Sequence, residues 1–175
     1  MIWWSNETNF NNWVGKYRKY PIYERQAEEV RRDLKYLRNM NDSQKPTFLD
    51  VGGGDGRIGI GTVIDASKGD DITSKETWDK LPMFDVCFTS LVLITLKEEE
   101  VDFVISQMKS HTKEFIYLFE ERAAGPNGPA CGALIRDDFG NKYYHNLAQH
   151  LKDFKKFACV ESNVSELWEK WIIDI

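Results

Sequence analysis

A glycine-rich turn directly after a short apolar stretch is the segment of this sequence best suited to hold a ligand. Residues 47–51, TFLDV, predict a buried strand, and the run GGGDG after it places glycines at alternate positions. Glycine lets the backbone turn sharply and lets a ligand approach without meeting a Cβ atom. In open α/β sheets, ligands bind at the carboxyl ends of strands, which is where this turn would lie. A ligand-binding loop is therefore predicted at Asp50, Gly52, Gly54 and Gly56.

A dinucleotide-binding loop is the main alternative for this turn. The string GDGRIG, 54–59, matches the fingerprint G-x-G-x-x-G, which expects an acid about 20 residues further on. Asp65 lies 11 positions after Gly54, and Asp71 lies 17 positions after it. The preceding strand ends one residue before Gly52, so the frame G-x-G-x-G is favoured. An acid that ends the next strand, Asp65 in 61–65, is placed to accept hydrogen bonds from two ribose hydroxyls.

Strands and helices alternate along the chain and must position these residues. An amphipathic helix comes first, at 24–40, where apolar residues recur at three- and four-residue steps. After the two strands above, the sequence predicts a strand at 84–89, a helix from near Glu98, a buried strand at 115–119, a long Gly- and Pro-containing loop at 120–141, a helix at 143–154 and two strands within 157–174. This alternation predicts an α/β fold with a mainly parallel sheet.

The segment FLDVGGGDGRIGIGTVIDAS, 48–67, resembles motif I and the following acidic motif of class I S-adenosylmethionine-dependent methyltransferases. The resemblance continues through 84–96, FDVCFTSLVLITL, and 114–121, which look like the fourth and fifth strands of that family. By element order it covers about residues 24–175. It implies a three-layer α/β sandwich with a mostly parallel, seven-stranded sheet whose last strand is antiparallel.

The resemblance also implies a set of residues around S-adenosylmethionine and its product, S-adenosylhomocysteine. In chain order these are Asp50 at the amino group, Gly52, Gly54 and Gly56 at the methionine end, Asp65 at the ribose, Asp71 and Ile72 at the adenine, and Thr89, Ser90 and Leu91 beneath the methyl group. The implied function is methyl transfer to a small-molecule, peptide-like or flexible macromolecular acceptor. A non-catalytic module that binds the cofactor or supports a partner enzyme is the alternative.

The first crossover is shorter than the family allows. Only 15 positions separate Asp50 from Asp65, and the stretch before Phe84 is again short for a helix and a strand. The first crossover helix is therefore expected to be reduced to one or two turns. If Asp65 comes too early in the chain, Asp70 or Asp71 holds the ribose instead.

Methyl transfer from a sulfonium needs little catalytic machinery. The leaving group is neutral, so holding the nucleophile and the methyl group in line can supply up to about 7–11 kcal/mol. A hydroxyl acceptor would also need a general base, for which Glu120, Glu121 and His145 are the candidates. His145 and His150 are five positions apart, so they would not share a helix face. No acid or cysteine cluster accompanies them in the sequence, and no metal site is expected.

Composition and charge narrow the class of protein. The chain has 175 residues, which suit one domain, with 42% hydrophobic and 29% charged residues. A net charge of -5 argues against a general nucleic-acid binder. No apolar run approaches the ~20 residues that span a bilayer. Three widely spaced cysteines suggest neither a disulfide framework nor a zinc site, and favour the cytoplasm.

Aromatic residues gather in the first 23 positions, ahead of the amphipathic helix. Seven of the chain's 23 aromatic residues lie there. Such rings supply a large apolar contact area, which suits a wall over a ligand. The single domain is therefore expected to comprise an aromatic arm or lid at 1–23, the helix at 24–40 and a core at 46–175.

Overall fold

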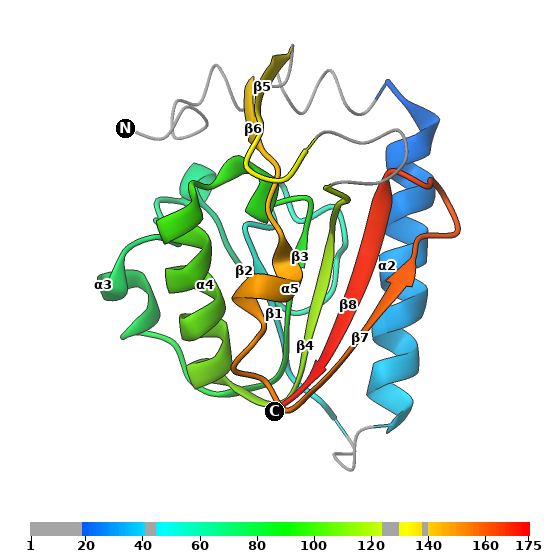
Figure 1. Cartoon of the computed structure of the whole chain (residues 1–175). Coiled ribbons are helices and arrows are strands. Elements are labelled where there is room, and N and C mark those ends of the chain that lie inside the picture. Colours follow the sequence, from blue (N-terminus) through cyan, green and yellow to red (C-terminus); the bar gives the residue numbers. More distant parts are fainter. Residues whose placement is uncertain (1–18, 41–44, 124–129, 138–139) are drawn as a thin grey trace.

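The computed structural model describes residues 19–40, 45–123, 130–137 and 140–175 (Figure 1). In chain order its elements are α2 (Pro21–Met40), β1 (Phe48–Val51), β2 (Thr62–Ile64), η2 (Ala66–Lys68), α3 (Lys75–Trp78), β3 (Phe84–Ser90), η3 (Leu93–Thr95), α4 (Glu98–His111), β4 (Thr112–Glu121), β5 (Leu134–Asp137), β6 (Gly140–Tyr143), α5 (Leu147–His150), β7 (Lys156–Glu161) and β8 (Trp168–Asp174). None of these helices is both long enough and apolar enough to cross a bilayer.

The main sheet has the strand order β2-β1-β3-β4-β8-β7. Strands β2, β1, β3 and β4 pair in parallel, whereas β8 runs antiparallel to both β4 and β7. The expectation of an α/β fold with a mostly parallel sheet and an antiparallel last strand is confirmed. The parallel strands end at the same edge of the sheet, so the loops after β1 and β3 lie side by side.

Within the described residues the main sheet has six strands, one fewer than the seven expected. Residues 65–83, all of them described, form η2 and α3 but no strand. This stretch is too short to hold a strand between two crossover helices. The expected short helix between β1 and β2 is also absent, because 52–61 forms turns in which five glycines have positive φ angles.

The segment before β7 differs from the expected long loop and helix. Strands β5 and β6 pair as a separate two-stranded sheet, which occupies part of the predicted loop at 120–141. Tyr143 is paired with Leu134 and therefore belongs to β6. The helix expected at 143–154 is consequently reduced to the four residues of α5.

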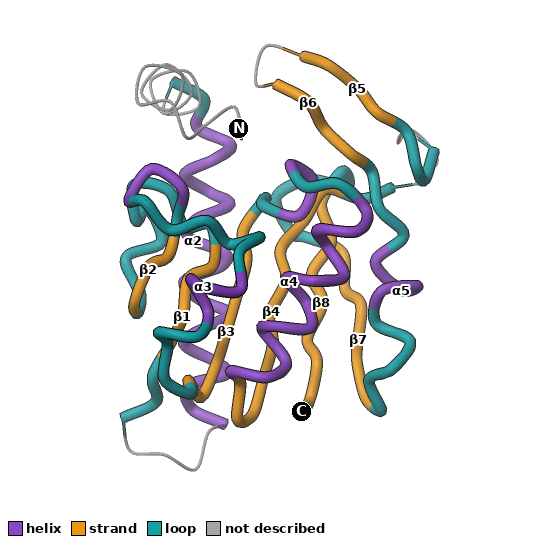
Figure 2. Tube along the Cα trace, turned by 90° about the vertical axis from the view of Figure 1, so that its left-hand side faces the viewer, coloured by secondary structure: helices purple, strands orange, loops and turns teal. Residues whose placement is uncertain are grey.

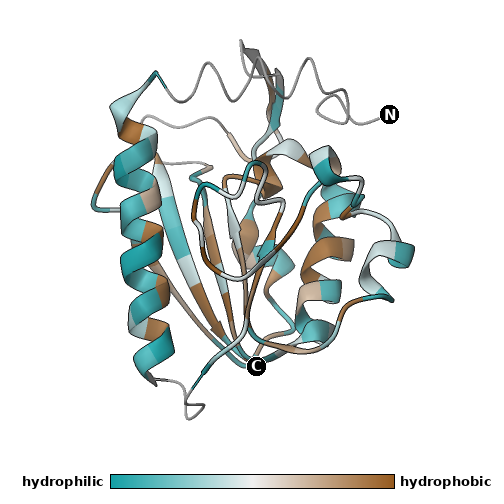
Figure 3. Ribbon diagram, turned by 180° about the vertical axis from the view of Figure 1, so that it is seen from behind, coloured by the Kyte–Doolittle hydropathy of each residue, from teal (hydrophilic) through white to brown (hydrophobic). Residues whose placement is uncertain are grey.

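Helices cover both faces of the main sheet. Helix α2 lies on one side, and α3, α4 and α5 lie on the other (Figures 1 and 2). The buried face of α2 presents residues at three- and four-residue steps, as its sequence predicts, and they are Ala27, Val30, Leu34 and Leu37. Figure 3 shows hydrophilic residues along most of α2 and hydrophobic residues concentrated in the central strands. The helix is therefore held by one apolar stripe against the sheet.

A buried ion pair supplements that stripe. Nζ of Lys170 on β8 lies 2.8 Å from Oε1 of Glu29 and 3.0 Å from Oδ2 of Asp33, both on α2. The Ser162 hydroxyl and the Asn163 backbone N–H also donate to the Glu29 carboxylate, at 2.6 and 3.0 Å. Burial alone would raise the pKa of Glu29, but these hydrogen bonds outweigh it and hold the pKa below its ordinary value. The carboxylate is thus kept charged beneath α2.

The predicted aromatic arm lies outside the described residues, apart from 19–23. Helix α2 begins at Pro21, three positions before the predicted start. The ring of Tyr23 lies 5.9 Å from that of Trp168 on β8 and packs against the apolar cluster beneath α2. Tyr20 remains half exposed. Tyr23 therefore belongs to the packing of α2 on the sheet.

Candidate functional site

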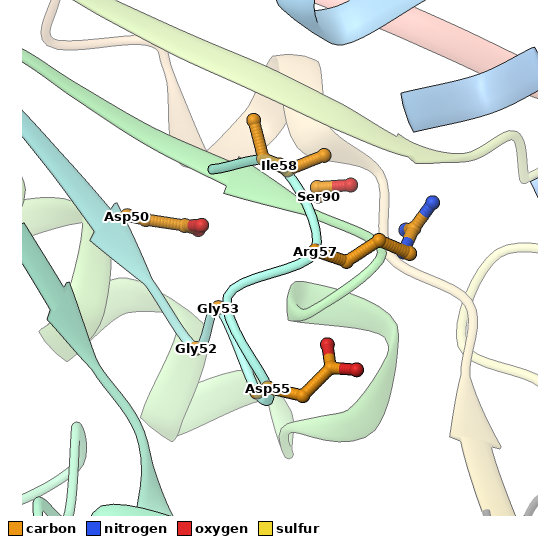
Figure 4. A pocket seen from close by; sticks show the side chains of 8 residues that line it. Asp50, Gly52, Gly53, Asp55, Arg57, Ile58 and Ser90 are labelled. Carbon is orange, nitrogen blue, oxygen red and sulfur yellow. The ribbon is translucent and has the colours of Figure 1, made fainter. Parts of the chain in front are cut away.

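A pocket opens where β1 and β3 end, between the glycine loop (52–61) and the end of β3 (Figure 4). Its walls come from the end of β1, the glycine loop and one residue of β3. The lining residues are Asp50, Gly52, Gly53, Gly54, Asp55, Arg57, Ile58 and Ser90. The pocket thus contains four of the residues that the sequence singled out.

Asp50 is the most unusual residue of this pocket. Its side chain is fully buried, and neither carboxylate oxygen has a hydrogen-bond partner among the described residues. Figure 4 shows the carboxyl group pointing from β1 into the space enclosed by the glycine loop. Burial raises the pKa of Asp50 to about 7, against which the nearby Arg57 acts. A buried carboxylate without a partner is costly, so this site fits a ligand that brings a cationic donor.

The glycine loop needs glycine because the chain packs tightly there. Gly52 has a φ angle of 73°, and a Cβ atom on it would lie 2.5 Å from Cγ1 of Val92. A Cβ atom on Gly53 would lie 2.5 Å from the carboxyl group of Asp50. Gly53 was not among the predicted residues, although its place within the run GGG was a signal. The lack of Cβ atoms at these two positions lets the loop pack closely against Val92 and Asp50.

Asp65 holds the glycine loop in place. One of its carboxylate oxygens accepts a hydrogen bond from the Gly54 backbone N–H at 3.0 Å. The other accepts from the backbone N–H and the hydroxyl of Ser67, at 2.8 and 2.6 Å. Asp65 is buried and does not line the pocket as the structure describes it. Gly56 continues the loop, with a φ of 78° and its N–H donating to the carbonyl of Gly53 at 2.9 Å.

The residues expected near the adenine lie apart from the pocket lining. Asp71 is exposed and accepts a hydrogen bond from the backbone N–H of Thr73 at 2.9 Å. Ile72 is buried in the core, and its carbonyl accepts from the Trp78 indole at 2.8 Å. Asp70, the other alternative for the ribose, is half-buried. The structure therefore brings neither Asp71 nor Ile72 together with Asp50.

The end of β3 places its three predicted residues in different surroundings. The Ser90 hydroxyl lines the pocket and accepts a hydrogen bond from Nε2 of Gln26 at 2.5 Å. Thr89 is buried, and its hydroxyl donates to Glu120 at 2.7 Å. Leu91 has a φ angle of 59°, the left-handed region that non-glycine residues rarely adopt. Such strain costs roughly 1–3 kcal/mol and is concentrated at functional sites, in line with a role for this turn.

Glu120, one candidate base, is buried behind the pocket wall. Besides the Thr89 hydroxyl it accepts hydrogen bonds from the backbone N–H groups of Val92 and Leu93, at 3.2 and 3.1 Å. Burial raises the pKa of Glu120 to about 7 in spite of these hydrogen bonds. The carboxylate therefore holds the start of η3, and through Val92 it supports the contact with Gly52.

The other two candidate bases, Glu121 and His145, also make contacts within the protein. The Glu121 carboxylate pairs with Lys142 at 2.8 Å and accepts a hydrogen bond from the Tyr144 hydroxyl at 2.8 Å. His145 is buried, with Nδ1 2.8 Å from Glu98 and Nε2 within hydrogen-bond distance of two backbone carbonyls. None of the three candidates lines the described pocket.

Two residues that the sequence analysis missed connect the pocket to α2. Arg57 donates to Oε1 of Gln26 at 2.6 Å and also to the backbone carbonyl of Tyr23. Gln26 is fully buried and donates to Ser90. Its place beside Ala27 on the apolar face of the helix was the available signal. Helix α2 is therefore bound to both walls of the pocket.

The two histidines that the spacing separates come together in the fold. His145 lies outside α5, whereas His150 ends it, so the helix-face argument does not apply. Ligand atoms of both, together with a carboxylate oxygen of Glu98, lie within 4.8 Å of one another. The sequence shows no acid or cysteine cluster beside these histidines because Glu98 is 47 positions from His145, and it is the fold that brings the Glu98 carboxylate to 2.8 Å from Nδ1 of His145.

Comparison with known proteins gives matches in structure only. No family model matches the sequence, and no curated protein sequence matches it. An S-adenosylmethionine-dependent methyltransferase from Thermotoga maritima, named as a possible histamine N-methyltransferase, matches with a TM-score of 0.63 and 12% identity, over 95% of this chain and 98% of that one. DhpI in complex with S-adenosylmethionine and HEP matches with a TM-score of 0.58 and 12% identity, over 98% and 96%.

A third match is a magnesium protoporphyrin IX methyltransferase from Synechocystis with bound S-adenosylmethionine. It has a TM-score of 0.53 and 14% identity, and it covers 87% of this chain and 79% of that one. The chain therefore has the fold of class I S-adenosylmethionine-dependent methyltransferases, as the resemblance of its sequence implied.

Proposed function

We propose that this protein is an S-adenosylmethionine-dependent methyltransferase that holds the methionine end of the cofactor in the glycine-loop pocket. The carrying observation is the buried, unpartnered carboxylate of Asp50 at the floor of that pocket. The α-ammonium group of the cofactor would supply the cationic donor that Asp50 lacks. The loop at Gly52, Gly53 and Gly54, which lines the pocket, would lie against the methionine end of the cofactor. The shared fold, with neighbours that bind this cofactor, supports the proposal.

Starting from the ammonium group at Asp50, the other parts of the cofactor can be assigned to residues further along the chain. Asp65 would hold the ribose through Oδ2, which accepts only the Gly54 N–H and has a lone pair left, whereas Oδ1 already accepts two hydrogen bonds from Ser67. Asp71 and Ile72 are proposed for the adenine, which requires the segment after η2 to approach the ligand. Beneath the methyl group the proposed residues are Thr89, Ser90 and Leu91, of which Ser90 lines the pocket.

Catalysis in this site would rest on orientation. When bound, S-adenosylmethionine supplies a methyl group on a positively charged sulfur. The protein's part is to fix the direction of approach, through a glycine loop tied to α2 by Arg57 and to η2 by Asp65. Orientation of this kind is worth up to about 7–11 kcal/mol.

The acceptor is proposed to be a small molecule or a peptide-like segment. Glu120, Glu121 and His145 each serve another contact, which favours an acceptor that needs no base in order to attack, such as a neutral amine with its free lone pair. The three cysteines are free, which suits the proposed cytoplasmic location.

The Gly54→Val variant tests the proposed pocket. Gly54 has a φ angle of 57°, and a β-branched residue is a genuine outlier in this region. The new side chain would also occupy the pocket, so the variant is expected to lose at least about 100-fold in affinity for S-adenosylhomocysteine, which is about 2.7 kcal/mol. Calorimetric titration gives the affinity, and circular dichroism checks the fold.

Gly69→Val is the matched control, because Gly69 has a φ of 88° but open space around it and lies away from the pocket. It carries similar backbone strain and should bind S-adenosylhomocysteine as the wild type does. Equal binding by folded Gly54→Val and Gly69→Val proteins would refute the proposed pocket.

Asp65→Ala is expected to weaken binding of the same ligand by about 1.5–3 kcal/mol, the range for hydrogen bonds of a charged group. The loss combines the proposed ribose contact with the released Gly54 N–H, which Asp65 now accepts at 3.0 Å. Asp71→Ala provides the comparison, since its carboxylate is exposed. If Asp71→Ala lost affinity and Asp65→Ala did not, the ribose assignment would pass to Asp71.

A further inference from the structure

Two parts of the chain that are distant in sequence place one carboxylate and two imidazoles together on the α4 side of the sheet. Glu98 is the first residue of α4, His145 follows β6, and His150 is the last residue of α5. Figure 1 shows α5 lying beside α4, in front of the sheet. The side chains of His145 and His150 are 4% and 3% exposed, whereas that of Glu98 is 55% exposed. These residues form the Glu98–His145–His150 cluster.

Backbone contacts fix the proton position on His145. Its Nε2 lies 3.0 Å from the carbonyl oxygen of Leu93 and 2.9 Å from that of Leu96. A carbonyl oxygen only accepts, so Nε2 carries the hydrogen. In the neutral ring Nδ1 then presents a lone pair, and it lies 2.8 Å from a carboxylate oxygen of Glu98. Two electron-rich atoms at this distance repel each other unless a proton or a metal ion lies between them.

A second carboxylate fixes the proton position on His150. Its Nδ1 lies 2.7 Å from Oδ1 of Asp102, one turn along α4, and donates to it. In the neutral ring Nε2 then presents a lone pair to the cluster. That atom is buried and has no hydrogen-bond partner among the described residues, although it lies 3.1 Å from Oε1 of Glu98. A carboxylate that orients the far side of an imidazole is the usual outer-shell arrangement of a metal-binding histidine.

We propose that the Glu98–His145–His150 cluster binds a divalent transition-metal ion, with Zn²⁺ as the expected occupant. Two imidazole nitrogens and one carboxylate oxygen are a recurrent Zn²⁺ donor set, which leaves a fourth position for water. Imidazole ligands favour this class of ion over Mg²⁺ and Ca²⁺, which select oxygen. The metal would take Nδ1 of His145 and Nε2 of His150, the two ring atoms that face the Glu98 carboxylate.

The position of the cluster gives the ion a structural consequence. A metal there would join the segment after β6 and the end of α5 to the start of α4. Through the Nε2 hydrogen bonds of His145 it would also fix the carbonyl of Leu93 in η3 and that of Leu96 just after it. The backbone N–H of Leu93 is held from the other side by Glu120. The site is independent of the proposed methyl transfer, because none of its ligands lines the glycine-loop pocket.

Calorimetric titration of the metal-free protein with Zn²⁺ tests the proposal, with Co²⁺ absorption as a second readout. One equivalent of Zn²⁺ should bind and raise the melting temperature, because the ion binds only the folded cluster. Glu98→Gln should weaken this binding at least 10-fold, and Asp102→Asn by about 10- to 100-fold, as for other outer-shell partners. Both side chains are mainly exposed, at 55% and 68%, so both variants should fold.

Glu99→Gln is the matched control, since Glu99 is exposed, neighbours Glu98 and is not a member of the cluster. It makes the same change of charge in the same turn of α4 and should bind Zn²⁺ as tightly as the wild type. Two results would overturn the proposal: a wild-type protein that binds no Zn²⁺, or a folded Glu98→Gln protein that binds as tightly as Glu99→Gln.

Discussion

Asp50→Asn is expected to stabilise the folded protein at neutral pH and, in the same protein, to weaken cofactor binding. Burial raises the pKa of Asp50 from its ordinary 3.8 to about 7, so the folded chain keeps a proton that the unfolded chain releases. Below pH 3.8 the carboxyl group is protonated in both states and does not lower the free energy of unfolding. As the pH rises from 3.8 to about 7, the group lowers that free energy progressively. At about 1.4 kcal/mol per pH unit the full cost is about 4 kcal/mol. Asparagine keeps the shape of the side chain and cannot ionise.

Urea denaturation between pH 4 and pH 8 measures this effect. The free energy of unfolding of Asp50→Asn relative to wild type should grow with pH over this range, by about 4 kcal/mol. Asp85→Asn is a control of opposite sign. Burial alone would raise the pKa of Asp85, but hydrogen bonds from Thr47 and Lys113 outweigh it and lower the pKa. This control should therefore lose stability at neutral pH, and lose less as the pH falls.

The predicted loss of cofactor affinity distinguishes a carboxylate that takes part in binding from one that only lowers the stability of the fold. If Asp50 pairs with the cofactor's ammonium group, Asp50→Asn should lose about 2–5 kcal/mol of affinity, the cost of removing one partner of a buried charge pair. Titration with S-adenosylhomocysteine at pH 8 gives this value. A more stable variant that binds as tightly as the wild type would show that Asp50 has no part in binding.

Lys170→Met is expected to destabilise the protein by about 3–5 kcal/mol at neutral pH. Its ammonium group lies 2.8 Å from Glu29 and 3.0 Å from Asp33, and removal would leave the Glu29 carboxylate buried without its cation. The methionine side chain keeps the apolar stem, so packing is little changed. The pKa of Glu29 is held below 4.5, so the stability that its charge contributes is present at neutral pH and is lost as the pH falls below 4.5.

Lys156→Met supplies the control for this variant. Lys156 pairs with Asp174 at 3.2 Å, but its side chain is 79% exposed. Exposed ion pairs contribute about 0–1 kcal/mol, so this change should be nearly neutral. Urea denaturation at pH 7 compares the two variants. Equal stabilities would mean that the buried pair does not hold α2 to the sheet.

The parts of the fold that were predicted depend on local patterns. Helix α4 begins at Glu98 as expected, and β1, β3 and β4 lie where apolar runs predict strands. The two strands predicted within 157–174 correspond to β7 and β8. The seventh strand came from resemblance alone, and 65–83 has too few residues to form it. The hairpin of β5 and β6 escaped detection because the glycines and prolines around it indicate a loop.

In the candidate site, too, only the residues that lie close together in the sequence could be predicted. The glycine loop could be predicted because a strand, a turn and an acid follow one another within 48–65. Contacts across the fold could not: Gln26 meets Ser90 over 64 positions and Arg57 over 31. The cluster around Glu98 was missed for the same reason. Pairing of His145 with an acid 47 positions away depends on the hairpin that precedes it.

The position of S-adenosylhomocysteine in a crystal structure of the complex, grown at neutral pH, tests the central claim most directly. The proposed function places the amino group of the ligand within hydrogen-bond distance of the Asp50 carboxylate, which has no partner without it. The methionine end should lie against Gly52, Gly53 and Gly54, with the sulfur towards Ser90. A ligand bound elsewhere, or one in the pocket with Asp50 still unpartnered, would contradict the account.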